Sequence, residues 1–564
     1  MKRILPLLPL LLASACTRPD APPPIVQVAT TEPAPISATP DPVAEDGRLT
    51  AFLDEAFDAQ TALSPQQQTG LGLKTNYARL DDNTDADRER LLSLRRSQRE
   101  RMRSQFDPAQ VSAGGRLSFN LFEYEVQRAE DAHRWRWHNF PATNNGSPLG
   151  AIPVFLINQH RIDNVADAEA YVARLRDTER ALAEIAANMR AQAERGIVPP
   201  AFNFVPVRAD GQRVLAGAPF REGPDTPLFA DFKTKVGRLE VPQAEKDRLI
   251  VTAREALTGP FRRGYQSIFA ALDSIEPRAQ GNRGAWALPD GAAYYADRLR
   301  SQTTTGLSAD QIHDIGLAQV ARIHGEMGAI QRQVGFRGSL QDFFRHITSS
   351  DQFKYPNTEA GRQQYLTDAR AFIAQVMAAA PRYFRRLPAA PLEVRAVESF
   401  RQATAAVAFY NRPTPDGSRP GIYYVNLADM TQVLKPQIEA ISYHEGAPGH
   451  HFQVALAQEL PGVPKFRRFG GFTAYGEGWG LYSERLGKEM GFYHDPYSDF
   501  GRLSTELWRA VRLVVDTGIH HKRWTREQAI DYFLTNALLS RLDATKEVER
   551  YFCLLYTSPS PRDS

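Results

Sequence analysis

The segment Ile441-Ser-Tyr-His-Glu-Gly-Ala-Pro-Gly-His-His-Phe452 holds the densest group of metal-binding side chains in the chain. In the common HExxH arrangement, two histidines four residues apart share one helical face and bind zinc, and the glutamate beside them acts as a base. His444 and Glu445 begin this pattern, but Pro448 stands where the second histidine should fall. A zinc site here therefore requires a break in the helix.

Two histidines follow the break and compete for the second ligand position. On an unbroken helix, His450 would be rotated by about 240° from His444, and His451 would lie about 10 Å along the axis. The glycines and the proline between them favour a looped backbone instead. A two-residue insertion then returns His450 to the ligand position. We expect His444 and His450 to bind zinc, with Glu445 as the base and His451 as a supporting neighbour.

A third ligand is expected from the helical segment Thr473-Ala-Tyr-Gly-Glu-Gly-Trp-Gly-Leu-Tyr-Ser-Glu484. Glu477 and Glu484 are seven residues apart and share a face. A glutamate in a helix is usually a surface residue, but the nearby histidines favour a ligand role for Glu477. Glu484 is expected to orient a ligand histidine or an arginine. We therefore expect one Zn²⁺ per chain.

Polar residues recur every four positions in the segment Arg512-Leu-Val-Val-Asp-Thr-Gly-Ile-His520. This spacing places Arg512, Asp516 and His520 on one helical face. Asp516 would orient His520 toward a transition-state oxyanion, and Arg512 would meet a substrate carboxylate. A structural ladder of ion pairs has the same spacing, so both interpretations stay open.

The segment Arg419–Leu427 has a Pro-Gly turn signal followed by β-branched and aromatic residues, which predicts a strand. A strand beside a zinc site commonly pairs with an extended peptide. Tyr423, Tyr424 and Asn426 are therefore candidate substrate-binding residues. A small structural hairpin explains the pattern equally well.

Four ordered motifs carry a family resemblance: HEGAPGHHFQ at 444–453, YGEGWGLYSE at 475–484, the 512–520 segment and WTREQA at 524–529. Together they resemble the bacterial family called domain of unknown function 885, and the likeness extends upstream to Gln311–Gly316. The resemblance implies a mainly α, large helical zincin-like metallopeptidase fold with a small antiparallel β-sheet beside the active-site cleft. It also implies peptide substrates, with the carboxypeptidase and oligopeptidase types both open.

Composition sets the remaining bounds. The 564 residues are 42% hydrophobic and 24% charged, which is typical of globular proteins, and the net charge of +3 gives no reason to expect a nucleic-acid partner. Helical periodicity dominates, for example in Ala168–Gly196, Ser308–Val334 and the basic but amphipathic Asp87–Gln105. We expect a helical N-terminal region over residues 48–395 and a zinc-site catalytic region over 396–552.

Residues 1–16 resemble a bacterial lipoprotein signal peptide. Lys2 and Arg3 precede a short apolar run, and small residues precede Cys16, which would carry the lipid. Thr17 after the cysteine favours the periplasmic face of the outer membrane by family analogy. An ordinary cleaved signal is the alternative. Residues 17–47, rich in Pro, Ala and Thr, are expected to form a disordered tether.

The last residues, 553–564, look like translated sequencing-adapter read-through. The family typically continues after the segment ending at Tyr551 with a Pro-Gly-Gln segment and a Ser-Tyr-Lys helix. We therefore expect a truncated chain whose tail from about Cys553 does not pack on the domain.

Two functions remain in view. The first is a zinc-dependent hydrolase that cleaves peptide bonds of exported or periplasmic peptides, with Glu445 as general base. The second is a non-catalytic, lipid-anchored peptide-binding protein on a peptidase-like scaffold. The presence of Glu445 favours the first, because a structural zinc site needs no base.

Overall fold

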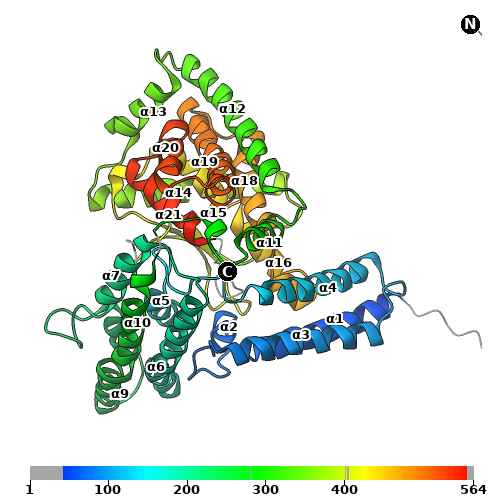
Figure 1. Ribbon diagram of the computed structural model, residues 1–564, viewed down its shortest axis with the longest axis vertical. Helices are drawn as coiled ribbons and strands as arrows, with labels where there is room; N and C mark the ends of the chain where they lie inside the picture. Colours follow the sequence, from blue (N-terminus) through cyan, green and yellow to red (C-terminus); the bar gives the residue numbers. More distant parts are fainter. Residues whose placement is uncertain (1–41, 280, 400–401, 403–404, 555–564) are drawn as a thin grey trace, which may run out of the picture. The chain divides into compact units, whose positions relative to one another are not determined.

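The computed structural model describes residues 42–279, 281–399, 402 and 405–554. Helices account for 68% of the structure and are accompanied by one sheet of three strands (Figure 1). The prediction of a mainly α fold is confirmed. The expected signal peptide, Cys16, most of the tether and residues 555–564 lie outside the described residues.

The α-helices and strands follow one another in this order: α1 (Pro42–Thr61), α2 (Pro65–Gly70), α3 (Asp85–Gln105), α4 (Ala113–Arg134), α5 (Pro148–Gln159), α6 (Val165–Glu194), α7 (Phe204–Val214), α8 (Pro227–Gly237), α9 (Gln243–Ala256), α10 (Arg262–Ile275), α11 (Gly291–Thr303), α12 (Ala309–Gln333), α13 (Leu340–Ser349), α14 (Glu359–Ala379), β1 (Leu392–Ala396), β2 (Ala408–Asn411), β3 (Gly421–Val425), α15 (Ile438–Glu445), α16 (His450–Gln458), α17 (Lys465–Phe469), α18 (Thr473–Glu489), α19 (Pro496–His520), α20 (Arg526–Asn536) and α21 (Arg541–Leu554).

Local sequence explains where several helices begin. Reciprocal capping boxes, in which a Ser or Thr hydroxyl and the side chain three residues later each bond the other's backbone, start α12 at Ser308, α13 at Ser339 and α20 at Thr525. The helices predicted in Asp87–Gln105 and Ser308–Val334 begin at Asp85 and Ala309, within two residues of the predicted positions. Among the helices of the described residues, none combines the length and apolarity needed to cross a bilayer.

The N-terminal helices form two separate packing groups, drawn in blue and in teal to green (Figure 1). In the first, α1, α3 and α4 pack around Leu53, Met102 and Phe122. In the second, α5 to α10 pack around a larger core that includes Phe232. Because α1 begins at Pro42, the last residues of the expected tether, 42–47, are helical instead.

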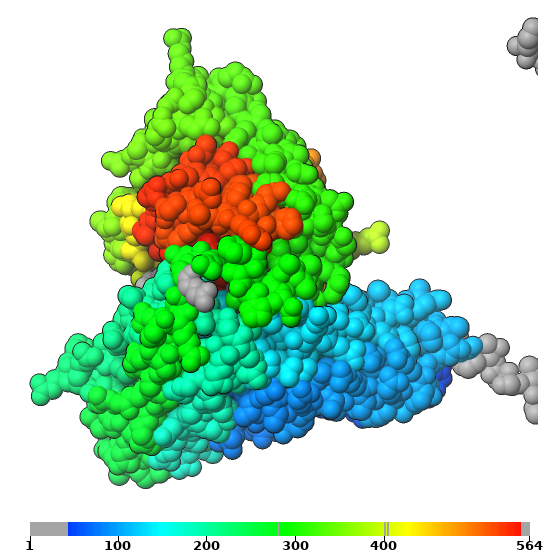
Figure 2. All heavy atoms as spheres, viewed as in Figure 1, coloured from blue at the N-terminus to red at the C-terminus, as the bar shows by residue number. Residues whose placement is uncertain are grey.

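Two further cores cross the expected boundary at residues 395/396. One joins Phe343 of α13 to Leu507 of α19 and Phe533 of α20, and the space-filling view shows the red atoms of the last helices embedded among green atoms of the middle of the chain (Figure 2). The other joins Tyr365 of α14 to Tyr443 of α15. The described residues from Pro42 onward therefore belong to one compact unit.

Cys553 corrects part of the expectation for the tail. It lies in α21, is fully buried, and its Sγ is 3.3 Å from Oδ1 of Asn203. The buried face of α21, formed by Ala544, Val548 and Tyr551, extends to this position, so a small apolar side chain fits there. The prediction that the foreign, unpacked segment starts at Cys553 is wrong for this residue.

The sheet is mixed, which corrects the expected antiparallel pairing. Its order is β1-β3-β2, with β1 parallel and β2 antiparallel to the central strand β3. All five residues of β3 are buried. The edge strand β2, in contrast, lines a cavity together with α15, α16 and α18. The sheet thus lies beside the candidate site, but a different strand faces it.

Candidate metal centre

The helix break predicted from the sequence is present. α15 ends at Glu445 and α16 begins at His450, so each helix delivers one histidine from its end. The two imidazole rings are 4.7 Å apart and nearly perpendicular. Gly449 lies so close to the end of α15 that a Cβ there would be 2.0 Å from the carbonyl oxygen of His444. The return of His450 to the face of His444 therefore depends on a residue without a side chain.

Helix α18 brings the third expected ligand to the pair. An Oε of Glu477 is 3.6 Å from Nε2 of His444, and the other Oε is 3.7 Å from Nε2 of His450. Donor atoms of the three residues all lie within 4.8 Å of one another. Tetrahedral zinc with bonds of about 2.1 Å separates its ligand atoms by about 3.4 Å, so the set of two imidazoles and one carboxylate fits zinc in kind and in spacing.

The close packing of α18 on α15 depends on Gly480. A Cβ at this position would be 2.5 Å from Cε1 of His444. Gly476 and Gly478, which directly flank Glu477, meet almost nothing. The glycine that permits the close approach of the two helices is therefore one turn after the candidate ligand Glu477.

Glu484 lies behind His444, as the sequence indicated. Its Oε1 is 2.9 Å from Nδ1 of His444, and its other oxygen accepts a hydrogen bond from the hydroxyl of Thr505. Burial and the charge of Arg509 lower the pKa of His444, but the carboxylates of Glu477 and Glu484 outweigh them and raise it to about 9. A carboxylate that holds Nδ1–H of a histidine leaves Nε2 directed at the ligand position.

Glu445 is buried beside the cluster and lines the same cavity. Burial raises its pKa to about 7, although His444 acts in the opposite direction. Glu477 behaves differently: burial raises its pKa, but its hydrogen bond to His444 and its positive neighbours outweigh this and hold the pKa well below the usual range. The pKa of Glu445 is thus raised while that of its neighbour Glu477 is lowered. A raised pKa suits Glu445 as a base, and a lowered pKa suits Glu477 as a carboxylate that stays ionised.

Arg509 of α19 is a member of the site that sequence reasoning missed. Its Nη2 is 3.0 Å from Nδ1 and 3.1 Å from Nε2 of His444, and its Nη1 is 3.4 Å from Glu484. The in-plane lone-pair directions of the two ring nitrogens diverge, so a single atom about 3 Å from both nitrogens must lie over the face of the ring. Nη2 of Arg509 therefore does not block the in-plane direction of Nε2, and Nε2 stays available to bind a metal ion. Arg512, Asp516 and His520 share one face of α19, and Arg509 lies about one turn before Arg512 near the same face. Extending the spacing argument one turn toward the N-terminus would have identified it.

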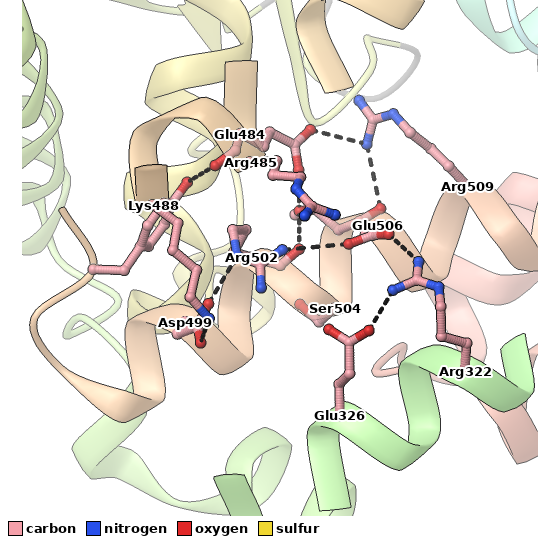
Figure 3. Close-up of polar contacts among 12 residues, drawn as sticks. Arg322, Glu326, Glu484, Arg485, Lys488, Asp499, Arg502, Ser504, Glu506 and Arg509 are labelled. Carbon is pink, nitrogen blue, oxygen red and sulfur yellow. Dashed lines mark hydrogen bonds and ion pairs between the residues drawn. The ribbon is translucent and has the colours of Figure 1, made fainter. Parts of the chain in front are cut away.

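An ion-pair network fixes the helices behind the site (Figure 3). From α19, Glu506 pairs with Arg502 and with Arg322 of α12. Asp499 of α19 pairs with Lys488 of α18 at 2.7 Å. Figure 3 shows these side chains following one another from Glu484 and Arg509 to α12. The two helices that hold the candidate ligand Glu477, Glu484 and Arg509 are therefore tied to a third.

His520 and Asp516 do not join the centre, which corrects the expected catalytic pair. Nδ1 of the buried His520 accepts a hydrogen bond from the backbone N–H of Ala285, and Nε2 is 3.2 Å from the carbonyl oxygen of Tyr551. Burial lowers the pKa of His520 to about 3. Asp516 instead accepts a hydrogen bond from Tyr295 at 2.6 Å. His520 is eleven residues beyond Arg509, about 16 Å along α19.

Arg512 lines the cavity, but its charge is already compensated. Its guanidinium is 2.6 Å from Glu547 and donates to the hydroxyl of Tyr551 at 3.2 Å. The ladder interpretation of the 512–520 stripe therefore describes its contacts better than the catalytic one, although the partners come from other helices.

The expected substrate-binding residues, two on β3 and Asn426 directly after it, make their contacts within the fold and not with the cavity. The hydroxyl of Tyr423 is 3.1 Å from that of Tyr365, Tyr424 stacks on Phe409, and Asn426 donates to the carbonyl of Gln402. A central strand has both edges paired and cannot add a peptide. The prediction is wrong for these three residues because pairing with β1 and β2 was not visible in the strand's own sequence.

His451 points away from the cluster. Nε2 donates to the carbonyl of Ala390, and Nδ1 is 3.0 Å from the hydroxyl of Tyr410 on β2. Tyr410 also stacks on His450, with ring centroids 6.4 Å apart. His451 therefore supports the second ligand histidine through Tyr410, as a neighbour and not as a ligand.

The cluster opens into a cavity of about 1960 Å³. Its other walls come from α1 to α4, from β2, and from α16, α17, α19 and α21. α17 closes one side by packing on the N-terminal helices, with Phe466 against Phe122 and Arg467 donating to Ser118. The candidate metal centre thus lies at the wall of a large cavity that is open to solvent.

Comparison with known proteins agrees with the sequence motifs. Among solved structures, the chain is similar to "the putative lipoprotein from Colwellia psychrerythraea" with 29% identity and a TM-score of 0.81, covering 91% of this chain and 90% of that one. A "putative lipoprotein of unknown function" from Shewanella oneidensis shares the fold at 19% identity, with a TM-score of 0.64 and 90% coverage of both chains. No curated protein matches the chain. The family model described as "Bacterial protein of unknown function (DUF885)" matches residues 65–554, and the chain belongs to this family.

Proposed function

We propose that the protein is a zinc-dependent hydrolase of peptide bonds. The observation that carries the proposal is the convergence of His444, His450 and Glu477 at the wall of a large cavity, with the buried carboxylate of Glu445 next to them. Bound by these three side chains, one zinc ion would supply Lewis-acid activation of water and of the scissile carbonyl. An open fourth position distinguishes such a site from a structural one.

The chain's own residues supply the proton transfers and the charge. Glu445 accepts a proton from the attacking water and delivers it to the leaving nitrogen, a role favoured by its pKa of about 7. Arg509 takes the part first given to His520, because its guanidinium is the charge that lies against His444 and faces the cavity. It stabilises negative charge developing on the carbonyl oxygen. Glu484 keeps His444 in the required orientation.

Export and lipid attachment at Cys16 complete the proposal. They rest on the signal-like first residues and on the likeness to a protein described as a lipoprotein. The periplasmic face of the outer membrane is the expected location, and exported or periplasmic peptides are the expected substrates.

The test combines metal analysis with digestion of a mixed peptide library. We expect one zinc per chain, loss of peptide cleavage on chelation, and recovery when zinc is added back. Stoichiometric zinc without cleavage of any peptide would favour the alternative, a lipid-anchored peptide-binding protein on a peptidase-like scaffold. Cleavage that persists after complete removal of metal would contradict the zinc mechanism.

A further inference from the structure

The cavity in front of the candidate centre is strongly cationic. Eleven of its lining residues are Lys or Arg and seven are Asp or Glu, and three of these acids, Glu445, Glu477 and Glu484, belong to the centre itself. The remainder of the wall therefore has a large excess of positive charge, which attracts and orients anionic groups.

Some of these cations are neutralised and some are not. Arg512 pairs with Glu547, and Arg128 pairs with Glu125. Arg412, in contrast, donates from Nη1 to the backbone carbonyl of Phe469 at 2.8 Å, and no carboxylate of the described residues lies within ion-pair distance of it. Burial lowers its pKa, as expected for a guanidinium without a counter-ion. A partly buried charge without a partner is costly for folding alone.

The position of Arg412 relates it to the metal centre. It follows the edge strand β2 directly, two residues after Tyr410, and both residues line the cavity. Tyr410 contacts His451 and stacks on His450, which lines the same cavity. Two residues of extended chain span about 7 Å. Arg412 is therefore about 7 Å along the chain from the residue that stacks on His450, on the wall of the cavity that holds the candidate centre.

We propose that Arg412 binds a carboxylate of the peptide substrate and so selects substrates with an anionic group near the cleaved bond. This inference rests on the proposed function and adds a substrate class to it. Arg412 takes the role that the sequence suggested for Arg512, whose guanidinium is occupied by Glu547. A guanidinium forms two parallel hydrogen bonds to a carboxylate, which fixes the geometry of the bound end.

The carboxylate has two chemical sources, the C-terminus of the peptide and an acidic side chain. Three peptides of one sequence separate them: a free C-terminal acid, the C-terminal amide, and the amide with one glutamate added next to the cleaved bond. The zinc-loaded full chain is compared with Arg412→Gln, Arg412→Lys and the control Arg263→Gln. Arg263 is exposed, pairs with Glu179 on the N-terminal helices and does not line the cavity.

We expect Arg412→Gln to raise KM about 10- to 100-fold for the peptide that carries the recognised carboxylate. The matching neutral peptide should be unaffected, and Arg412→Lys should fall between the two. A preference for the free acid identifies the C-terminus as the source, and a preference for the glutamate peptide identifies the side chain. Equal losses on all three peptides, or no loss on any of them, would overturn the proposal.

Binding measured by calorimetry keeps this inference separate from the proposed function. Glu445→Gln, which should bind without cleaving, is titrated with the three peptides, with and without Arg412→Gln. Tighter binding of the acid or of the glutamate peptide than of the plain amide, if it depends on Arg412, supports the inference even if no peptide is cleaved. Hydrolysis with no difference among the three peptides leaves the hydrolase in place and removes the role of Arg412.

Discussion

The candidate metal cluster and the polar stripe at 512–520 were both inferred from residue spacing, but they have very different surroundings. His444, His450 and Glu477 line a cavity and bring their donor atoms within 4.8 Å of one another. Asp516 and His520 direct theirs at Tyr295, at Ala285 and at the backbone of Tyr551. Regular spacing places side chains on one face of a helix, but the function of that face depends on what packs against it.

The largest expected effect distinguishes His450 of the candidate metal cluster from its neighbour His451. His450→Ala should weaken zinc binding by more than about 100-fold, because an inner ligand is lost. His451→Ala should cost no more than the 10- to 100-fold typical of an outer partner. Zinc content after dialysis against a graded chelator measures both. Loss of zinc in His451→Ala with zinc retained in His450→Ala would show that the ligand assignment is wrong.

Glu445→Gln comes next in size. It should reduce kcat about 100- to 10,000-fold, because a positioned general base is removed, while zinc content and melting temperature stay unchanged. Glu489→Gln is a matched control, since Glu489 is exposed on α18 and, within the described part of the chain, pairs only with Arg485. Release of zinc from Glu445→Gln would instead make this residue a ligand.

For His520, on the stripe at 512–520, we expect the opposite profile. His520→Ala leaves the N–H of Ala285 and the carbonyl of Tyr551 without their partner, and should cost about 2–4 kcal/mol of folding free energy. The kcat/KM of the folded protein should change by less than about threefold. Thermal unfolding and peptide hydrolysis on the same sample check both. A large loss of kcat without a loss of stability would restore the catalytic assignment.

The smallest effect concerns Asp516, whose pKa burial raises to about 6. A carboxyl group with a raised folded-state pKa favours the native state below its unfolded pKa near 4, and this contribution is lost as pH rises through 6. Asp516→Asn keeps an acceptor for Tyr295 and removes the titration. The variant should therefore gain melting temperature relative to the wild type between pH 4.5 and pH 7. A difference that is independent of pH would show that Asp516 is not titrating in this range.

The candidate centre was accessible to sequence reasoning because its geometry is local. The glycines around Pro448 signalled a loop, and the loop restored His450 to the face of His444. Glu477 and Glu484 needed only the periodicity of one helix. Fold class followed similarly from helical periodicity and from capping residues such as Ser308.

The wrong predictions concern residues whose role is determined by partners far away in the sequence. Nothing near β3 in the sequence shows that it is flanked by β1 and β2, so the sequence predicted a strand with a free edge for a peptide. His520 is held by Ala285, which is 235 residues away. Arg509 was missed because its role depends on the packing of α19 on α15, which places its guanidinium over His444.

The glycines at the centre also determine which mutations the protein tolerates. Gly449 and Gly480 bind nothing, yet a Cβ at either position would be too close to His444: 2.0 Å from its carbonyl oxygen at Gly449 and 2.5 Å from its ring at Gly480. Any other residue there would therefore force His444 to move. In a library of random single substitutions screened for activity, inactivating changes should therefore gather at these two positions as densely as at the ligands. The pattern of tolerated substitutions would then outline the packing around His444 as well as the chemistry.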